Sequence, residues 1–309
     1  MHNEKKHAYL ILAHNNFSIL KILLKLLDDP RNDLFIHIDK KVKAFDFDAY
    51  KRICSYSPVH FIVERIDIIW GRSSLIDAEM LLFEKAYTLG HYAYYHLISG
   101  VDLPIKTQDD IHDFFRGCSK SFIVYSDRNT EREYERLSLF CHIPAGGKAL
   151  IKYEDYFRRL QRVFKVNRFK KWERKGYTFE KGANWVSLTH EAVETLINEK
   201  ETIKKMTRYS HCADEVYKQI ILKKAGVPVY HDPDGKTKSL RLTDWSRGDG
   251  SHPYVFRMCD YDLIFQSNGL FARKFDQDID FQIVEAIYHK LKREDDSDVP
   301  QDTDKLLKE

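Results

Sequence analysis

The first half of the chain alternates short apolar runs with longer stretches of helical periodicity. Ala8–Ala13, Leu34–Ile38 and Tyr94–Ser99 have the length and apolar character of buried strands. Between them, Phe17–Leu27 and a stretch from Ser73 to about Tyr87 have the length and pattern of helices. This alternation is the signature of βαβ units, so the sequence predicts an α/β fold.

Two further apolar runs, His60–Val63 and Ser121–Tyr125, are also predicted to be strands. In an open α/β sheet, ligands lie beyond the carboxyl ends of the strands. The residues at those ends, His14–Asn16, Asp39–Lys41 and Ser99–Asp102, are all polar or small. This rule therefore predicts that the ligand-binding residues lie in these three segments, although polar and small residues after a strand also form ordinary turns.

Composition and charge exclude several classes of protein. With 43% hydrophobic and 31% charged residues, the chain is neither disordered nor fibrous. A net charge of only +3 argues against a general polyanion binder, so we expect no nucleic-acid partner. The five cysteines include no Cys-x-x-Cys pair, which argues against a disulfide framework. No apolar run approaches the roughly 20 residues of a membrane span, and the first apolar run, Ala8–Ala13, is too short for the hydrophobic region expected of a signal peptide. We therefore expect a cytoplasmic protein.

Several common catalytic motifs are missing. The chain has no phosphate loop, no dinucleotide fingerprint and no nucleophile elbow. Asp-x-Asp pairs, which can hold a divalent metal against a diphosphate, occur at 46–48, 232–234, 276–278 and 278–280. A useful pair should follow a buried strand, and none does so cleanly. Asp46 and Asp48 come closest, but helix capping explains them as well.

The run Val216–Leu222 has helical periodicity, and Asp214 and Glu215 are predicted to lie in the first turn of that helix. Carboxylates in a first helical turn are stabilised by the macrodipole, so they are either ordinary helix-start residues or catalytic groups. Further on, Trp245, Arg247 and the segment Leu270–Asp276 put basic residues close to aromatics. That combination suits a diphosphate with a base or sugar nearby. The pattern alone leaves both interpretations open.

The segment Arg158–Lys175 is strongly basic, because nine of its eighteen residues are Lys or Arg. Leu160 and Phe164 are four residues apart, and Trp172 follows, which predicts an amphipathic helix with a basic face. One interpretation is a solvated helix packed on the domain. The other is peripheral contact with an anionic membrane or with an anionic, lipid-linked acceptor.

Seven segments of the chain occur in the order found in one enzyme family: Ala8–His14, Ile36–Lys41, Trp70–Ser74, Leu97–Thr107, Gly182–Trp185, Ala213–Glu215 and Leu270–Asp276. The most specific are Ser-Gly-x-Asp-x-Pro-Ile-Lys at 99–106 and Phe-Ala-x-Lys-Phe at 271–275. Over residues 7–290, the chain resembles the family 14 glycosyltransferases. These are the core-2 and I-branching β-1,6-N-acetylglucosaminyltransferases and the peptide O-xylosyltransferases.

The resemblance implies a GT-A-like, Rossmann-like mixed sheet flanked by helices, in one catalytic domain over residues 1–293. Within it we expect a nucleotide-sugar half at about 7–125 and a variable basic segment facing acceptor or membrane at about 126–181. A catalytic and diphosphate-binding half follows at about 182–293, and a mobile acidic tail at 294–309. The resemblance also implies inverting chemistry, a UDP-sugar donor and no metal or other cofactor.

Individual roles follow by matching residues to the family motifs. Glu215 matches the catalytic base, with Ala213 in place of the usual proline, and Lys274 matches the lysine that contacts the diphosphate. Its arginine companion is expected to be Arg247 ahead of Arg257. The resemblance further places His14, Asp39, Gly100 and Asp102 on the donor side, and Asp214, Trp185 and Trp245 on the acceptor side.

The resulting prediction is a bacterial-type, cytoplasmic transferase, with contact to the inner membrane face as a further expectation. It would move a β-linked sugar, N-acetylglucosamine ahead of xylose, from a UDP-sugar to a hydroxyl of a glycan or lipid-linked glycan. Two alternatives stay open: a metal-dependent transferase that uses an Asp-x-Asp pair, and a non-catalytic glycan- or membrane-binding module centred on Arg158–Lys175.

Overall fold

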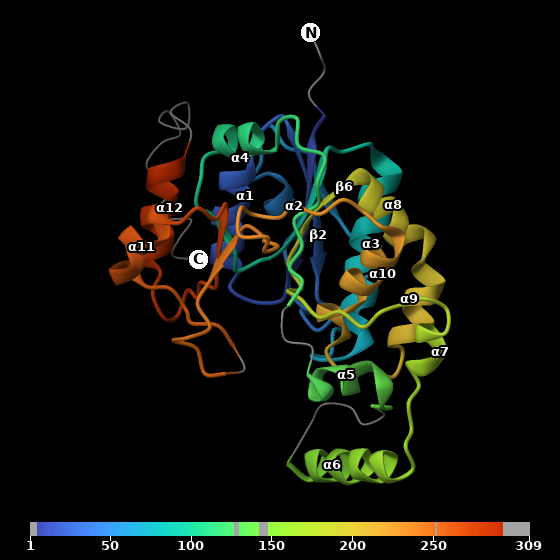
Figure 1. Ribbon diagram of the computed structural model, residues 1–309. Helices are drawn as coiled ribbons and strands as arrows, with labels where there is room; N and C mark the ends of the chain where they lie inside the picture. Colours follow the sequence, from blue (N-terminus) through green and yellow to red (C-terminus); the bar gives the residue numbers. More distant parts are fainter. Residues whose placement is uncertain (1–4, 127–129, 142–147, 251, 293–309) are drawn as a thin grey trace.

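A mixed five-stranded sheet forms the centre of the molecule, in a computed structural model that describes residues 5–126, 130–141, 148–250 and 252–292 (Figure 1). The strand order is β3-β2-β1-β4-β6. Its strands are β1 (His7–Ala13), β2 (Asn32–Ile38), β3 (Val59–Phe61), β4 (Tyr94–Ser99) and β6 (Ser187–Thr189). The first four are parallel, and β6 is an antiparallel edge strand. The predicted α/β class is confirmed.

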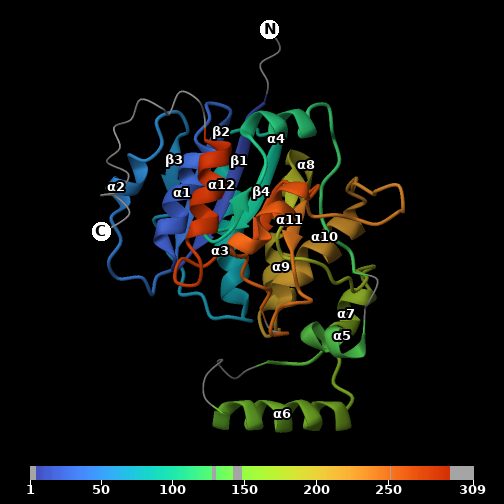
Figure 2. The same ribbon diagram turned by 90° about the vertical axis from the view of Figure 1, so that its left-hand side faces the viewer.

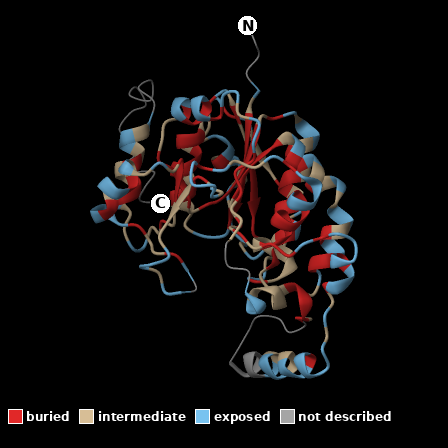
Figure 3. Cartoon of the chain, viewed as in Figure 1, coloured by how far each residue is buried: buried red, intermediate tan, exposed pale blue. Residues whose placement is uncertain are grey.

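Strand β1 lies in the middle of the sheet and is buried on both faces. Ala8, Leu10 and Leu12 belong to one hydrophobic cluster, which also contains residues of α3 (Ser73–Leu89), α8 (His190–Asn198) and α10 (Tyr217–Ala225). Tyr9 and Ile11 belong to a second cluster, with α1 (Phe17–Leu27) and α12 (Gln282–Leu291). Buried residues line both sides of the sheet (Figure 3). A parallel strand covered by helices on both faces must be apolar at every position, and this is why β1 can be recognised in the sequence.

A second, three-stranded sheet brings the C-terminal part of the chain to the end of the first. It consists of β5 (Leu103–Pro104), β8 (Phe271–Arg273) and β7 (Arg241–Thr243) in that order. The strands are short, and flanking backbone bonds extend the pairing: Ile105 N–H donates to the carbonyl of Leu270 and Phe275 N–H to that of Val101. The segment after β8 is therefore fixed against the loop that leaves β4.

The remaining helices lie around this core. They are α2 (Phe47–Lys51), α4 (Gln108–Phe115), α5 (Glu131–Ser138), α6 (Lys148–Val163), α7 (Lys170–Glu173), α9 (Lys200–Thr207) and α11 (Tyr261–Gln266), with 3₁₀ turns at Ala213–Glu215 and Met258–Asp260. Figures 1 and 2 show α5 and α6 beyond the end of the sheet opposite the N-terminus, with α6 at the periphery. Among the described residues, no helix combines the length and apolar character that a bilayer span requires.

The structure corrects two predicted strands. The third strand is Val59–Phe61, and Val63, at 97% exposed, lies outside it. Ser121–Tyr125 forms only isolated bridges, from Ser121 to Val229 and from Phe122 to Ser187. The capping interpretation of Asp46 is confirmed, since its carboxylate accepts from the N–H of Ala49 at 2.8 Å. The tail predicted at 294–309 lies outside the described residues.

Candidate active site

The strand order changes direction between β1 and β4, since β2 and β3 follow on one side of β1 and β4 lies on the other. Ligands of doubly wound sheets bind at such a switch point. Here Gly100 lies directly against β1: its N–H donates to the carbonyl of Leu12 at 2.8 Å. A Cβ at Gly100 would lie 2.8 Å from the Cβ of Ala13, so any side chain would push the two strand ends apart.

Three predicted donor-side residues, His14, Asp39 and Lys274, are close enough to interact electrostatically. The buried carboxylate of Asp39 accepts from the backbone N–H of Lys41 at 2.8 Å and lies 3.4 Å from the Lys41 ammonium. Loss of hydration lowers the pKa of His14. The charges of Lys41 and Lys274 act in the same direction, against the attraction of Asp39. This strand end therefore brings two lysines and the buried carboxylate of Asp39 around an imidazole whose pKa is lowered.

Lys274 is positioned by the backbone on either side of it. Its own carbonyl accepts from Phe256 N–H at 3.0 Å, and Phe275 N–H donates to the carbonyl of Val101 at 3.1 Å. Three residues further, Gln277 N–H donates to the side-chain oxygen of Asn16, in the loop after β1. Within the described residues the Lys274 ammonium forms no ion pair, which leaves it available to an anionic ligand.

Asp102 lies beneath the loop that leaves β4 and is wholly buried. Its carboxylate accepts from the N–H and hydroxyl of Ser99 and lies 3.5 Å from the Arg273 guanidinium. That guanidinium lies 4.5 Å from the centre of the Trp185 ring. Burial lowers the pKa of Arg273, and the charge of Asp102 opposes this effect. Asp102 is thus shielded from solvent, and it positions Ser99 and Arg273.

A second cation, Arg241, is partly buried and was not identified from the sequence. Its guanidinium donates to the hydroxyl of Ser187 at 2.9 Å and to the carbonyls of Val186 and Leu97 at 2.7 and 3.1 Å. Burial lowers its pKa to about 9. Arg241 follows a polar segment and alternates with apolar residues in β7, so its sequence context resembles that of a surface arginine.

Arg247, the expected arginine companion of Lys274, already has partners. Its guanidinium donates to Asp244 at 2.6 Å and to Asp260 at 2.7 Å, and it lies 4.0 Å from the centre of the Tyr254 ring. These contacts connect two ends of the loop between β7 and α11. The same loop carries Trp245, which is 56% exposed and therefore accessible to a ligand.

Glu215 is in a 3₁₀ turn, Ala213–Glu215, that precedes α10, and this corrects the prediction that it lies in the first turn of the helix itself. Cys212, immediately before the turn, has a left-handed backbone conformation (φ 46°), which is strained for a residue with a side chain. The turn is fixed from outside. Cys212 N–H donates to the carbonyl of Gly71, and Gly182 N–H donates to that of Glu215 at 2.8 Å.

The Glu215 carboxylate is about one-third exposed, at 30%, and faces two cations from the variable segment. Its Oε2 atom accepts from Arg136 of α5 at 2.6 Å and lies 3.7 Å from the Lys181 ammonium. Burial acts to lower the pKa of Arg136, but the charge and hydrogen bond of Glu215 raise it overall. Neither cation belongs to a recognisable motif, so sequence reasoning missed both.

A buried polar network lies behind this turn. The Lys218 ammonium donates to Glu79 at 2.8 Å and to the side-chain oxygen of Asn184 at 2.6 Å. Glu79 also accepts from the Tyr217 hydroxyl at 2.8 Å and from the Asn184 amide at 2.7 Å. The side chains of Lys218 and Glu79 are both wholly inaccessible to solvent. Such an ion pair persists only when its hydrogen bonds are satisfied, as they are here.

Asp214, predicted on the acceptor side, lies between Glu215 and this network. Burial raises its pKa to about 7, the charges of Glu79 and Glu215 contribute in the same direction, and Lys218 opposes them. Asp214 itself is partly exposed, and its backbone carbonyl accepts from the Lys218 ammonium at 3.2 Å, which connects it to the network.

The segment Gly182–Trp185 joins the two parts of the candidate site. Its first residue is bonded to the backbone of Glu215, Asn184 belongs to the buried network, and Trp185 packs against Arg273. A Cβ at Gly182 would lie 1.7 Å from the carbonyl oxygen of Val124, so this close approach requires glycine. The predicted base and the cationic strand end are thus connected through one four-residue segment.

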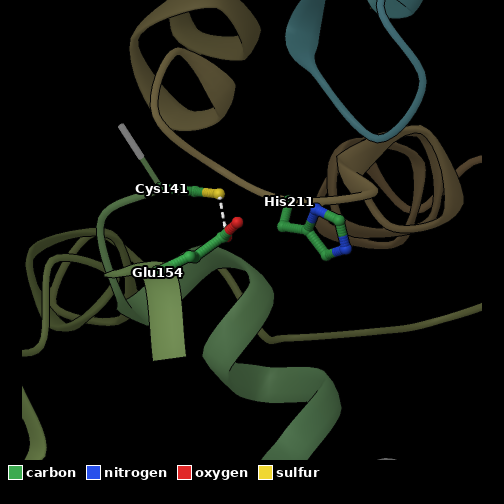
Figure 4. A group of neighbouring side chains, drawn as sticks. All are labelled: Cys141, Glu154 and His211. Carbon is green, nitrogen blue, oxygen red and sulfur yellow. Dashed lines mark hydrogen bonds between the residues drawn. The ribbon is translucent and has the colours of Figure 1, made fainter. Parts of the chain in front are cut away.

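A neighbouring cluster has the side-chain types of a metal site. The potential ligand atoms of Cys141, Glu154 and His211 lie within 4.8 Å of one another (Figure 4). However, the Cys141 thiol donates to Glu154 at 2.6 Å, Arg72 donates to the same sulfur, and Arg158 donates to the same carboxylate at 3.1 Å. The guanidinium groups of Arg72 and Arg158 supply the positive charge that balances the Glu154 carboxylate. We therefore assign the cluster as a packing contact that joins α6 to the residues around Cys141 and His211.

A cavity of about 480 Å³ opens between α3, α9 and the segment after β2. Its lining mixes acidic and basic side chains, among them Asp67, Asp77, Lys200 and Lys204. It adjoins the strand end at Lys40 but contains none of the candidate residues. The convergence of cations and carboxylates at the carboxyl ends of β1, β2 and β4 is therefore the better guide to chemistry.

Comparison with known proteins identifies one family of enzymes. A family model described as "Core-2/I-Branching enzyme" matches residues 7–267. The match extends from β1 to the end of α11 and includes Glu215, but it stops before Lys274.

Individual relatives are distant. An N-acetyllactosaminide β-1,6-N-acetylglucosaminyl-transferase of Mus musculus is 22% identical over 287 residues, covering 87% of this chain and 68% of that protein. The Homo sapiens protein of the same name is also 22% identical, over 284 residues. A xylosyltransferase of Ciona intestinalis is 21% identical over 308 residues, and the chain spans only 34% of its length.

Two solved structures match the chain with TM-scores below 0.5. The WbbM bifunctional glycosyltransferase has a TM-score of 0.45 and 10% identity, covering 98% of this chain and 51% of that one. Mouse xyloside xylosyltransferase 1 has a TM-score of 0.39 and 10% identity, covering 86% and 96%.

Proposed function

The chain belongs to the Core-2/I-branching enzyme family of glycosyltransferases, and on that premise we propose that it transfers a sugar from a UDP-sugar to a hydroxyl of a glycan acceptor, with Glu215 as the general base. N-acetylglucosamine is the first candidate sugar and xylose the second, after the activities for which the relatives are named. The observation that carries the proposal is the segment Gly182–Trp185, which ties a partly exposed carboxylate to a cationic strand end.

The proposed mechanism begins with the acceptor. A sugar hydroxyl has a pKa far above 7, so it must lose its proton as it attacks the anomeric carbon. Arg136 engages Oε2 of Glu215, which leaves Oε1 to accept that proton. General-base catalysis of this kind contributes roughly a hundred- to ten-thousand-fold. Attack opposite the leaving group inverts the configuration and gives a β-link from an α-linked donor.

The departing diphosphate gains negative charge, and fixed cations are needed to stabilise it. Lys274 is the cation that we assign to this role, because its ammonium has no ion-pair partner among the described residues. Arg247 would instead shape the loop that carries Trp245, since its guanidinium is shared between Asp244 and Asp260.

Replacing Lys274 with alanine is expected to weaken UDP binding about tenfold to a hundredfold, because a hydrogen bond from a charged donor contributes about 1.5–3 kcal/mol. Titration calorimetry with UDP measures the change. Lys290→Ala, which removes an exposed lysine of α12, is the matched control and should bind UDP normally. An unchanged affinity in Lys274→Ala would remove this residue from the donor site.

We expect turnover to be insensitive to chelator, because cations of the protein supply the charge. The alternative is a metal held by an Asp-x-Asp pair, but these aspartates already cap the backbone: Asp46 accepts from Ala49, Asp232 from Lys236 and Asp276 from Asp278. The assay is donor turnover after treatment with EDTA. Loss of activity that Mn²⁺ or Mg²⁺ restores would establish the metal-dependent alternative.

Screening UDP-sugars for donor hydrolysis, with thermal shift as a measure of binding, tests the proposal as a whole. One UDP-sugar should be hydrolysed slowly and should raise the melting temperature. A chain that neither binds nor hydrolyses any of them would be the non-catalytic alternative. We place the reaction in the cytoplasm, where activated sugar nucleotides are made.

A further inference from the structure

Helix α6 is attached to the rest of the protein through one face. Gln161 is buried and exchanges two hydrogen bonds with the backbone of Phe140, at 2.7 and 3.0 Å. Arg162 forms a bidentate pair with Glu135 of α5, at 2.6 and 2.7 Å. About two turns earlier, Glu154 accepts from the Cys141 thiol (Figure 4). These polar contacts fix the rotation of α6 about its axis.

The opposite face is apolar and exposed. We define the α6 stripe as the five exposed apolar and aromatic residues along and just after the helix: Tyr153, Tyr156, Leu160, Val163 and Phe164. Their exposed fractions are 67%, 67%, 39%, 75% and 71%. Successive members are separated by three, four, three and one residues, so all lie on one side of a helix. The sequence pattern also pointed to Trp172, but that side chain is buried in the main core.

The surroundings of the stripe are basic. Arg159 and Lys165 are exposed beside it, and neither has an ion-pair partner within the described part of the chain. Further along, the exposed cations are Lys170, Lys171, Arg174 and Lys175. Arg158 and Arg162 do not contribute, because they are paired with Glu154 and Glu135. The charge of this surface is therefore carried by fewer residues than the sequence pattern indicates.

We propose that the α6 stripe docks this protein on an anionic lipid surface. Contiguous exposed apolar residues on a soluble protein mark a contact site. Tyrosine and phenylalanine suit the boundary between headgroups and acyl chains, and adjacent lysines and arginines are attracted to anionic lipid. A second copy of the chain is the weaker fit, because it would bring unpaired cations of like charge together. The inference does not depend on the proposed transferase chemistry.

Vesicle co-sedimentation tests the stripe. The wild-type chain should bind vesicles of phosphatidylcholine mixed with phosphatidylglycerol, with binding that weakens as salt increases, and should bind phosphatidylcholine alone at least about tenfold more weakly. The triple substitution Tyr156→Ser, Leu160→Ser and Phe164→Ser should lower binding to the mixed vesicles at least about tenfold. The matched control replaces three exposed apolar residues that lie outside the stripe: Val63→Ser, Leu89→Ser and Leu263→Ser. This control variant should bind the mixed vesicles as the wild type does.

The charge contribution has its own variant. Arg159→Glu with Lys165→Glu should reduce binding to the mixed vesicles while leaving the melting temperature unaltered, whereas Lys290→Glu on α12 should bind normally. The stripe variant should likewise keep the wild-type melting temperature and donor hydrolysis, since the contacts of Glu215 and Lys274 among the described residues do not involve the stripe.

Three results would overturn the proposal. The first is wild-type vesicle binding by the stripe variant, and the second is equal binding to neutral and anionic vesicles. The third is a dimer in sedimentation without lipid that the stripe variant converts to a monomer, which would make a second copy the occupant. None of these results bears on Glu215 or Lys274, so failure of the docking proposal and failure of the catalytic one are distinguishable.

Discussion

Glu215→Gln is expected to lower turnover at least a hundredfold while leaving the affinity for UDP close to that of the wild type. Glutamine has nearly the same shape and can still accept a hydrogen bond from Arg136, but it cannot take a proton from the acceptor hydroxyl. The expected loss is the contribution of a general base, roughly a hundred- to ten-thousand-fold.

Single-turnover kinetics with saturating donor, together with calorimetry for UDP, separate chemistry from binding. Glu191→Gln, on the exposed surface of α8, is the matched control and should retain full turnover. Turnover within a few-fold of wild type in Glu215→Gln would show that another group takes the proton. Asp214 would then be the first residue to substitute, since its pKa of about 7 also suits proton transfer.

Lys218→Met is expected to lower the free energy of unfolding by about 3–5 kcal/mol, because it leaves the buried Glu79 carboxylate without its counter-charge. Domains have a total stability of about 5–15 kcal/mol, so the variant would be close to unfolding at 37 °C. Urea denaturation at 25 °C measures the change.

Two further variants identify the cause. Lys218→Met combined with Glu79→Gln removes both charges but keeps an oxygen to accept from the Asn184 amide and an amide to donate to the Tyr217 hydroxyl, so we expect it to be more stable than Lys218→Met alone. The exposed pair of Lys200 and Glu84 is the control, and Lys200→Met should cost no more than about 1 kcal/mol. A similarly small loss in Lys218→Met would contradict the buried pair.

The central sheet was predictable because its inner strands must be apolar at every position. Residues on both faces of β1 and β4 are buried, so each strand appears as a short apolar run, and Phe17–Leu27 was predicted with the boundaries that α1 has. The second sheet was not predictable. Its strands β5, β7 and β8 contain two or three residues each, which is too short for any periodicity to be visible.

The candidate site shows a similar division. Residues within ordered motifs, such as Glu215, Asp102 and Lys274, could be named as candidates because their neighbours in sequence are also specific. Arg136 and Lys181 reach Glu215 only through the fold, from a segment that carries no recognisable motif. Lys218 is a sharper case: a lysine near the start of a helix normally points to solvent, and its partner Glu79 lies 139 residues away.

The basic segment shows why composition is a weak guide to a surface. The pattern predicted an amphipathic helix but not which aromatic residues would be covered. Phe169 and Trp172 pack into the core, whereas Tyr153 and Tyr156, outside the most basic stretch, are exposed. Which side is covered depends on the hydrogen bonds of Gln161 and the pairing of Arg162, and both partners lie in elements remote in sequence.

Two adjacent residues of α5 hold two different parts of the molecule. Glu135 is bonded to Arg162 on α6, and Arg136 is bonded to Glu215. A shift of α5 would therefore alter the contacts of α6 and those of the Glu215 carboxylate together. Thermodynamic linkage makes such an effect reciprocal. If docking on lipid changes the affinity of the chain for its acceptor, then acceptor binding must change the affinity for lipid by the same factor.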